Sequence, residues 1–270
     1  RYHDGKKTQE EMKEELLLLK RNFSKVVYFD DSAATSVVLF NIFEFVDEYW
    51  KRSIFKNLEL YKKELYGGHL FSDYYHHQFN IDDGSKSFLN QTSDCADLNK
   101  LKVAWNIGIG AFPVATDNVL NREYASIRKI VTGLSALPSI YPVRMAVKKY
   151  ISAMKSELAK NVNITEKSGL ISGRFESNIY RNSIGKQRLL MLEKIKNKEI
   201  YLKGKLDRWS FTQEASKVSG MLSPFGWGEV CYRDFEAAIG GAVLIKPDMS
   251  HIDTWPNIFT NKSYIALSWD

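Results

Sequence analysis

The residues best suited to chemistry gather between Ser223 and Asp248, in the stretch SPFGWGEVCYRDFEAAIGGAVLIKPD. Gly226 and Gly228 precede a predicted helix, where a glycine-rich turn exposes backbone N–H groups at the positive end of the helix dipole. Arg233, one turn into that helix, adds a guanidinium suited to charge-assisted contacts. The pattern predicts a site for a phosphate or pyrophosphate.

Two acids, Glu229 and Glu236, lie seven residues apart, so we expect them to share roughly one helix face. A carboxylate is the usual protein partner of a ribose diol. Glycine turn and acids together therefore predict a nucleotide held by its phosphates and its sugar. The alternative is structural: Glu229 stabilises the helix N-terminus, Arg233 pairs with Glu236, and the glycines only turn the chain.

The elements that must position these residues follow the order of a parallel α/β sheet. A capped helical pattern, EEMKEELLLLKRNF, leads into the strand-like run KVVYF, which ends at Asp30 and Asp31. Residues 37–63 are predicted to be helical, and YGGHLFSDYYHHQF to be less regular. A further strand is expected in LKVAWNIGIGAF.

A second α/β series begins at Gly169. Its expected strands are GLISG, EIYLKGKL, AVLIKP and SYIALSW, its expected helices SIGKQRLLMLEKIKN and TQEASKVSGML, and DMSHIDTWPNIF is expected to be a loop. Residues 223–248 should run loop, helix, loop, strand. Before this series, a helix from Val143 carries a basic face, which is either solvated or faces a membrane surface. The predicted organisation is an N-terminal domain over 1–142, a linking helix and loop over 143–168, and a C-terminal domain over 169–270.

Composition is that of a globular protein, with 44% hydrophobic and 26% charged residues in 270. The net charge of +6 favours anionic partners. Two cysteines, Cys95 and Cys231, make a disulfide framework improbable. We find no signal peptide and no apolar run near the roughly 20 residues that a membrane span needs. Because the chain begins at Arg1 without Met and stops after a strand pattern, we expect further chain at both ends.

The stretch SPFGWGEVCYRDFEAAIGGAVLIKPDMSHIDTWPNIF resembles the donor-binding segment of bacterial GT-B glycosyltransferases of surface polysaccharide assembly. FEAAIGGAVLI matches the second half of their pattern and places Glu236 at the ribose-binding acid. The first acid of the pattern falls at Gly228, so Glu229 is displaced by one residue. GLISGRF resembles the first strand of the family's second domain.

The resemblance implies an α/β GT-B fold, in which two Rossmann-like domains face each other across a cleft. It places Arg174 at the donor phosphates, with Arg181 or Lys186 in place of the family's lysine. His251 would line the donor cleft. In an inverting enzyme the catalytic base would come from the first domain, and its candidates are Asp31, Asp30 and His69. A retaining enzyme would not need a base at that place, and both alternatives stay open.

The expected activity is metal-independent glycosyl transfer from a nucleotide-sugar donor to a glycan or lipid-linked acceptor, as in lipopolysaccharide synthesis. No cofactor or metal is expected, because no Cys/His cluster is spaced for one and the adjacent acids Asp30 and Asp31 point apart on extended backbone. The expected location is cytoplasmic, with peripheral contact to an anionic membrane surface; nucleic acid is not an expected partner. Two alternatives are a non-catalytic nucleotide- or glycan-binding module and a GT-B-like nucleotide-sugar epimerase.

Overall fold

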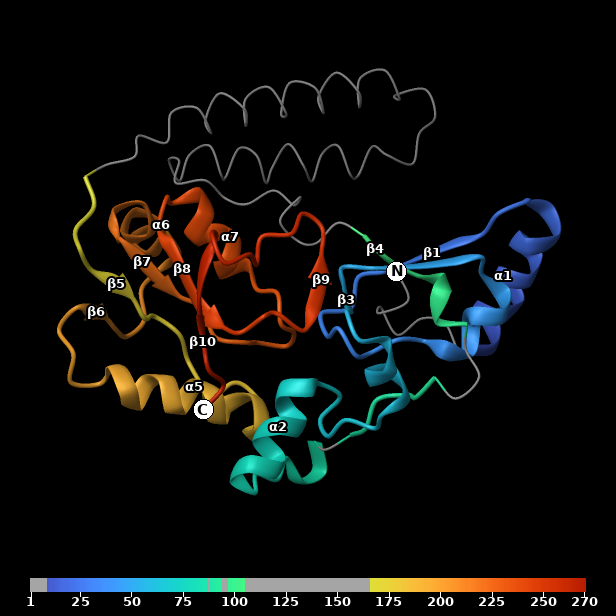
Figure 1. The fold of residues 1–270 in the computed structure, drawn as a ribbon, viewed down its shortest axis with the longest axis horizontal. Helices are drawn as coiled ribbons and strands as arrows, with labels where there is room; N and C mark the ends of the chain where they lie inside the picture. Colours follow the sequence, from blue (N-terminus) through green and yellow to red (C-terminus); the bar gives the residue numbers. More distant parts are fainter. Residues whose placement is uncertain (1–8, 87, 94–96, 105–165) are drawn as a thin grey trace, which may run out of the picture.

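The computed structural model describes residues 9–86, 88–93, 97–104 and 166–270 (Figure 1). The expected basic helix from Val143 and the glycines of LKVAWNIGIGAF lie outside these residues. Within them the protein is a mixed α/β structure with two parallel sheets and a two-stranded antiparallel sheet between them. Parallel sheets were expected from the alternation of helices and strands, and this expectation is confirmed.

The first sheet belongs to the N-terminal part and has the strand order β1-β2-β4, all parallel. Helix α1 (Gln9–Asn22) precedes β1 (Val27–Asp30), as predicted. Strand β2 (Glu48–Lys51) lies between β1 and β4 (Leu101–Val103). The strand predicted in LKVAWNIGIGAF is therefore confirmed at its start.

The predicted helix over 37–63 is wrong. This segment holds two 3-10 helices, Phe40–Phe45 and Leu58–Lys62, with β2 and β3 (Ser53–Phe55) between them. Burial alternates along both strands, which is the period-2 pattern of a strand rather than the 3.6-residue period of a helix. The buried aromatic side chains of this segment come from both kinds of element, Tyr49 and Phe55 from the strands and Phe43 and Tyr61 from the 3-10 helices.

The aromatic segment after Gly67 and Gly68 is more regular than expected, because it forms helix α2 (Leu70–Phe79). Both glycines have positive φ, and a Cβ at Gly68 would lie 2.2 Å from the Phe88 ring. The helix ends at Asn80, which adopts the left-handed conformation that asparagine tolerates. Gly68 and Asn80 thus mark the two ends of α2, which the aromatic composition of the segment did not predict.

The second sheet belongs to the C-terminal part and has five parallel strands in the order β10-β8-β7-β5-β6. Its strands are β5 (Ile171–Ser172), β6 (Tyr201–Leu202), β7 (Gly220–Leu222), β8 (Val243–Pro247) and β10 (Tyr264–Leu267). The connecting helices are α5 (Asn182–Ile195), α6 (Arg208–Lys217) and α7 (Tyr232–Ile239). Residues 223–248 run loop, helix, loop, strand as predicted. Residues 220–222, predicted as the end of a helix, form β7.

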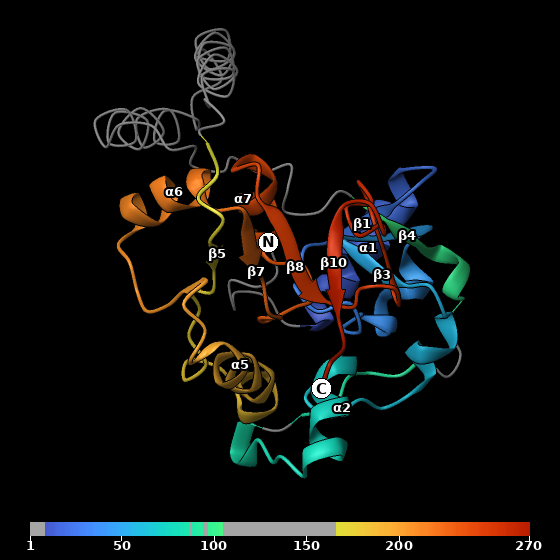
Figure 2. The same ribbon diagram turned by 60° about the vertical axis from the view of Figure 1, so that its left-hand side comes forward.

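Because parallel crossovers are right-handed, the reversal of strand order places α5 on one face of this sheet and α6 and α7 on the other. Figures 1 and 2 show this arrangement, with α2 beside α5. The expected loop DMSHIDTWPNIF contains strand β9 (Ile252–Thr254), which pairs antiparallel with β3. The β3–β9 pair therefore ties the two parts of the chain together.

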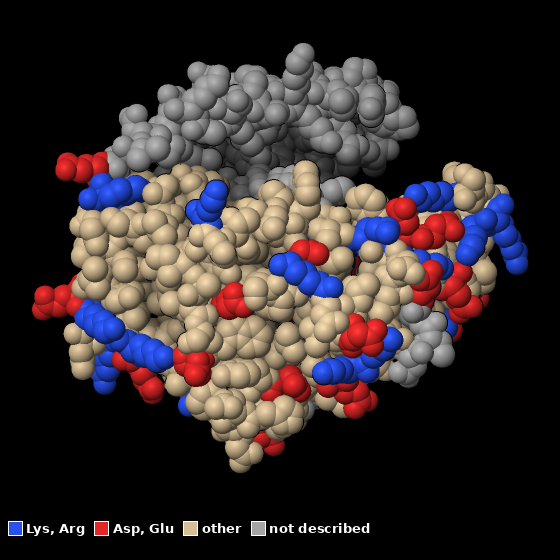
Figure 3. All heavy atoms as spheres, in the orientation of Figure 1, with Lys and Arg blue, Asp and Glu red and all other residues tan. Residues whose placement is uncertain are grey.

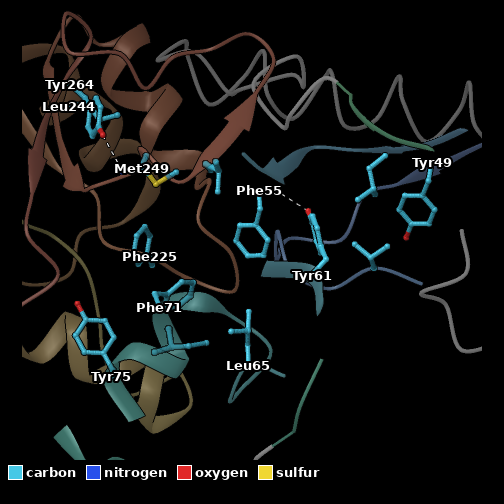
Figure 4. Close-up of a cluster of buried hydrophobic side chains, with 14 of the residues drawn as sticks. Tyr49, Phe55, Tyr61, Leu65, Phe71, Tyr75, Phe225, Leu244, Met249 and Tyr264 are labelled. Carbon is cyan, nitrogen blue, oxygen red and sulfur yellow. Dashed lines mark hydrogen bonds between the residues drawn. The ribbon is translucent and has the colours of Figure 1, made fainter. Parts of the chain in front are cut away.

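One hydrophobic core runs through both parts (Figure 4). Phe55 and Tyr61 contribute from the N-terminal part, and Leu244 and Met249 from the C-terminal part. The ring of Phe71 on α2 lies 4.6 Å from that of Phe225, measured between centroids. The described residues of the two parts are thus packed against each other through apolar side chains.

Candidate functional site

The strand order of the five-stranded sheet identifies the place where α/β proteins of this topology bind ligands. In chain order the strands run 2-1-3-4-5, so the connections change direction between β5 and β7. Ligands bind outside the carboxyl ends of the strands at such a switch point. The two segments that leave it are residues 173–181 after β5 and residues 223–231 after β7. These are the segments in which the sequence placed Arg174 and the glycine turn.

Two arginines hold these segments together. Arg188 on α5 donates from Nε to the carbonyl of Phe225 at 2.8 Å and from Nη1 to that of Glu176 at 2.7 Å. Arg233 on α7 donates from Nη2 to the carbonyl of Arg174 at 2.7 Å. Each guanidinium thus uses part of its donor set on backbone, and Nε of Arg233 is buried without a hydrogen-bond partner. Sequence reasoning missed Arg188, because it lies inside a plain amphipathic helix pattern.

The switch point is electropositive. Arg188 and Arg233 both act on the thiol of Cys231, and neither forms an ion pair within the described part of the chain. A Cβ built on Gly226 would lie 3.8 Å from Nη2 of Arg188, so the glycine turn comes close to this cation. The N-terminus of α7 lies at the same place, and its backbone N–H groups are capped: that of Cys231 donates to the Asp234 carboxylate at 2.9 Å, and that of Asp234 donates to the Cys231 carbonyl at 3.1 Å. Two guanidiniums therefore converge beside the positive end of the α7 dipole.

Arg174, the phosphate ligand implied by the resemblance, is engaged elsewhere. Its Nε donates to Glu214 at 2.6 Å, and its Nη1 donates to the carbonyl of Lys203. The Lys186 ammonium lies 5.0 Å from the centroid of the Phe79 ring, in the contact between α5 and α2. Both side chains thus make internal contacts.

Helix α7 begins later than predicted, and this changes the relation between the two glutamates. Cys231 occupies the N-cap and Tyr232 is the first helical residue, so Glu229 lies in the preceding turn. The expected common helix face of Glu229 and Glu236 is therefore wrong. Glu236 is half-buried on α7, whereas Glu229 is fully buried.

The carboxylate that organises the start of α7 is Asp234, which sequence reasoning missed. Its Oδ2 accepts from the backbone N–H of Cys231 at 2.9 Å, and its Oδ1 accepts from Ser223 at 2.6 Å. Lys246 on β8 completes a buried ion pair with Asp234 at 3.0 Å. Burial raises the pKa of the Cys231 thiol, so this cysteine remains protonated and packs as a small residue.

Glu229 links the glycine turn to the N-terminal part. Its Oε2 accepts from the backbone N–H of Thr35 at 3.1 Å and from the Thr35 hydroxyl at 2.9 Å. Its Oε1 is buried without a partner. A Cβ on Gly228 would lie 2.0 Å from the carbonyl oxygen of Ala33, so the close approach at this glycine is made by the protein's own backbone.

His69 makes a second link across the same junction. Its Nε2 lies 3.1 Å from the carbonyl of Trp227. Its Nδ1 lies 2.8 Å from the carbonyl of Gly67 and 3.3 Å from Nη2 of Arg181, which itself donates to Gly67 at 2.8 Å. Each ring nitrogen thus lies within hydrogen-bond distance of a backbone carbonyl, and a neutral ring can donate to only one of the two. Burial, the largest influence, lowers the pKa of His69, although Glu229 acts in the opposite direction.

His251 also lies at this junction, between the rings of Phe55 and Trp269. Both of its ring nitrogens are buried without a hydrogen-bond partner. Burial lowers the pKa of His251, and the nearby carboxylates of Glu229 and Asp248 act against that shift. His251 is thus packed against aromatic rings from both parts of the chain.

The two acids at the end of β1 have different environments. Asp30 accepts from Lys51 at 3.0 Å and from Tyr49 at 2.8 Å. Burial alone would raise the pKa of Asp30, but Lys51 and the hydrogen bonds hold it below its usual value. Asp31 is exposed and lies two residues before Ala33, which contacts the glycine turn.

In the part of the chain that the structure describes, no group of three or more His, Cys, Asp or Glu side chains is arranged to hold a metal ion. None of the helices in that part is both long enough and apolar enough to cross a bilayer. The face in Figure 3 carries acidic and basic side chains side by side. No protein-family model, curated protein or solved structure matches this chain.

Proposed function

We propose that this protein is a glycosyltransferase of GT-B architecture, which moves a sugar from a nucleotide sugar to a glycan or lipid-linked acceptor. The observation that carries the proposal is the convergence of Arg188, Arg233 and the α7 N-terminus at the switch point of the parallel sheet. A nucleoside diphosphate fits this place because it offers two adjacent anionic groups to fixed positive charge.

In this reaction the acceptor hydroxyl oxygen attacks the anomeric carbon, and the bond from that carbon to the diphosphate oxygen breaks. The diphosphate leaves with the bonding electron pair, and the two guanidiniums offset the developing charge. The acceptor proton passes to a base. Of the three implied bases we favour Asp31, because Asp30 is ion-paired with Lys51 and His69 is buried with its two nitrogens facing backbone carbonyls. We also propose that the protein works in the cytoplasm, at the inner surface of a bacterial membrane.

A second candidate is a non-catalytic nucleotide-binding module. It is favoured because two side chains expected to bind the nucleotide sugar are engaged within the protein. Arg174 is bound to Glu214, and Glu229 accepts from Thr35. In this candidate the anion site persists but the catalytic constellation is incomplete.

A thermal-shift screen of nucleoside diphosphates and nucleotide sugars tests the shared binding step, because a ligand that binds only the folded state raises the melting temperature. The stabilising donor is then incubated with and without glycan acceptors, and release of nucleoside diphosphate is measured. Acceptor-dependent release supports the transferase, and binding without turnover supports the binding module. An isomerised donor would assign an epimerase, and absence of any stabilising nucleotide would overturn the proposed site.

A further inference from the structure

An exposed aromatic surface lies beside the anion site. It consists of Ile179, Tyr180 and Trp227, which we call the aromatic shelf, and these residues come from the two segments that leave the switch point. Trp227 is 53% exposed and Ile179 is 60% exposed. Large apolar side chains that gather at a surface mark binding sites more often than isolated ones do.

The shelf is exposed, but its two aromatic rings are held by contacts within the protein. The ring centroids of Trp227 and Tyr180 lie 5.3 Å apart, and the Arg188 guanidinium lies 4.1 Å from the Tyr180 centroid. The carbonyl of Trp227 lies 3.1 Å from Nε2 of His69, and the N–H of Gly226 donates to the carbonyl of Gly228 at 3.1 Å. A preorganised tryptophan offers a flat contact face at low cost in conformational entropy.

The position of the shelf indicates which ligand it would meet. Trp227 directly follows Gly226, which approaches Arg188 on the anion side. Trp227 also adjoins the N-terminal part, since its carbonyl lies 3.1 Å from Nε2 of His69 and the Arg181 guanidinium near its ring also contacts the ring of Phe88. The shelf therefore lies between the proposed diphosphate and the part of the chain from which an acceptor would approach.

The chemistry of the shelf favours a neutral, hydroxylated ring. Its surface is apolar, and the indole N–H of Trp227 makes no hydrogen bond to another described residue. Of the nearby charges, Arg181 lies close to Asp83 and donates to the carbonyl of Gly67, and Arg188 belongs to the proposed anion site. A pyranose ring offers an apolar face of C–H groups to the indole and hydroxyl oxygens to its N–H.

We propose that the aromatic shelf binds a pyranose ring of the acceptor glycan, with Trp227 as the principal contact. The identification of this glycan as the acceptor rests on the proposed function. Saccharide binding by the shelf is, however, measurable without turnover.

The first test uses the indole N–H resonances of ¹⁵N-labelled protein, in which the Trp227 signal is identified by its loss in Trp227→Phe. A panel of methyl hexopyranosides should shift the Trp227 signal and leave that of Trp255, an equally exposed tryptophan, unchanged. A second panel of nucleosides without phosphate should leave both unchanged. The proposal is overturned if the nucleosides shift Trp227 and the glycosides do not, or if neither panel does.

The second test uses turnover with the donor found by the nucleotide screen. Trp227→Ala should raise the acceptor KM about tenfold, the effect of losing about 1.4 kcal/mol of binding. The donor KM and the melting temperature of Trp227→Ala should remain those of the wild type. Trp227→Phe keeps an aromatic ring, so its acceptor KM should stay close to that of the wild type. Trp255→Ala is the matched control. A change confined to the donor KM would overturn the acceptor assignment, whereas glycoside binding without any nucleotide binding would leave the shelf standing and the transferase proposal wrong.

Discussion

At the scale of single residues, the structure separates charges that are free for a ligand from charges that are already used. Arg174 and Arg233 lie on neighbouring segments, and each carries one positive charge near the same strand ends. Arg174 is paired with Glu214, whereas Arg233 forms no ion pair with a described residue and keeps Nε without a hydrogen bond. Their contributions to anion binding should therefore differ.

Arg233→Gln should weaken nucleoside diphosphate binding by about 1.5–3 kcal/mol, the value of a hydrogen bond to a charged group. Arg174→Gln removes the same charge but should weaken binding less, because that guanidinium is occupied by Glu214. Isothermal titration with the nucleotide that stabilises the wild type measures both. Equal losses in the two variants would show that only net charge matters.

The second residue-scale prediction concerns pH. Burial lowers the pKa of His69 below its usual value of about 6.5, so the unfolded chain binds the proton more readily than the folded one. Its contribution to stability is complete above pH 6.5 and declines as the pH falls from there toward the lower folded-state value. His69→Gln should therefore reduce the steepness of the loss of melting temperature on acidification below pH 6.5.

The wild type, measured in the same buffers, provides the reference profile. A His69→Gln profile that parallels the wild type throughout would contradict the assignment of a buried neutral imidazole. His251 contributes in the same direction and remains in both proteins.

At the scale of elements, the start of α7 depends on a buried ion pair. Asp234 caps the helix, and Lys246 on β8 balances its charge with both side chains fully buried. Removing one partner of such a pair leaves an uncompensated charge in the interior. The helix that presents Arg233 is therefore coupled to the neighbouring strand.

Lys246→Met should destabilise the protein by about 3–5 kcal/mol in urea unfolding. The double variant Asp234→Asn with Lys246→Met should be more stable than Lys246→Met alone, because the amide oxygen still accepts from Cys231 and no buried charge remains. A double variant that is less stable than the single one would refute this account.

At the scale of the whole molecule, the two parts are joined closely. The β3–β9 pair, the bond of Thr35 to Glu229 and the common hydrophobic core all cross between them. At Gly228 the two backbones approach so closely that there is no room for a side chain. The described residues should therefore unfold in one cooperative transition.

Gly228→Ala should lower the melting temperature strongly, because its Cβ would overlap the backbone of Ala33. Gly226→Ala is the matched control two residues away, where the nearest atom to a new Cβ is 3.5 Å distant and the contact is ordinary. Scanning calorimetry of both variants measures the difference. Similar melting temperatures would mean that the junction is not packed as described.

The sequence by itself predicted much of the C-terminal half. The strand and helix patterns after Gly169 are confirmed except at residues 220–222, which were predicted as the end of a helix and form β7. The loop, helix, loop, strand order of 223–248 is confirmed, because apolar periodicity and glycine turns report local structure directly. It misassigned 37–63, where aromatic residues occur at spacings compatible with both a helix and alternating strands. It also missed strand β9, which is stabilised by pairing with β3 about 200 residues earlier in the chain.

Only the tertiary structure decided which chemical groups meet. That Glu229 binds Thr35, that Arg174 is engaged by Glu214 and that Arg188 clamps the glycine turn all depend on contacts between segments distant in sequence. Residue types and spacing determine what a side chain can do. Its partners are set by how loops from different strand ends pack together, and no local pattern encodes that packing.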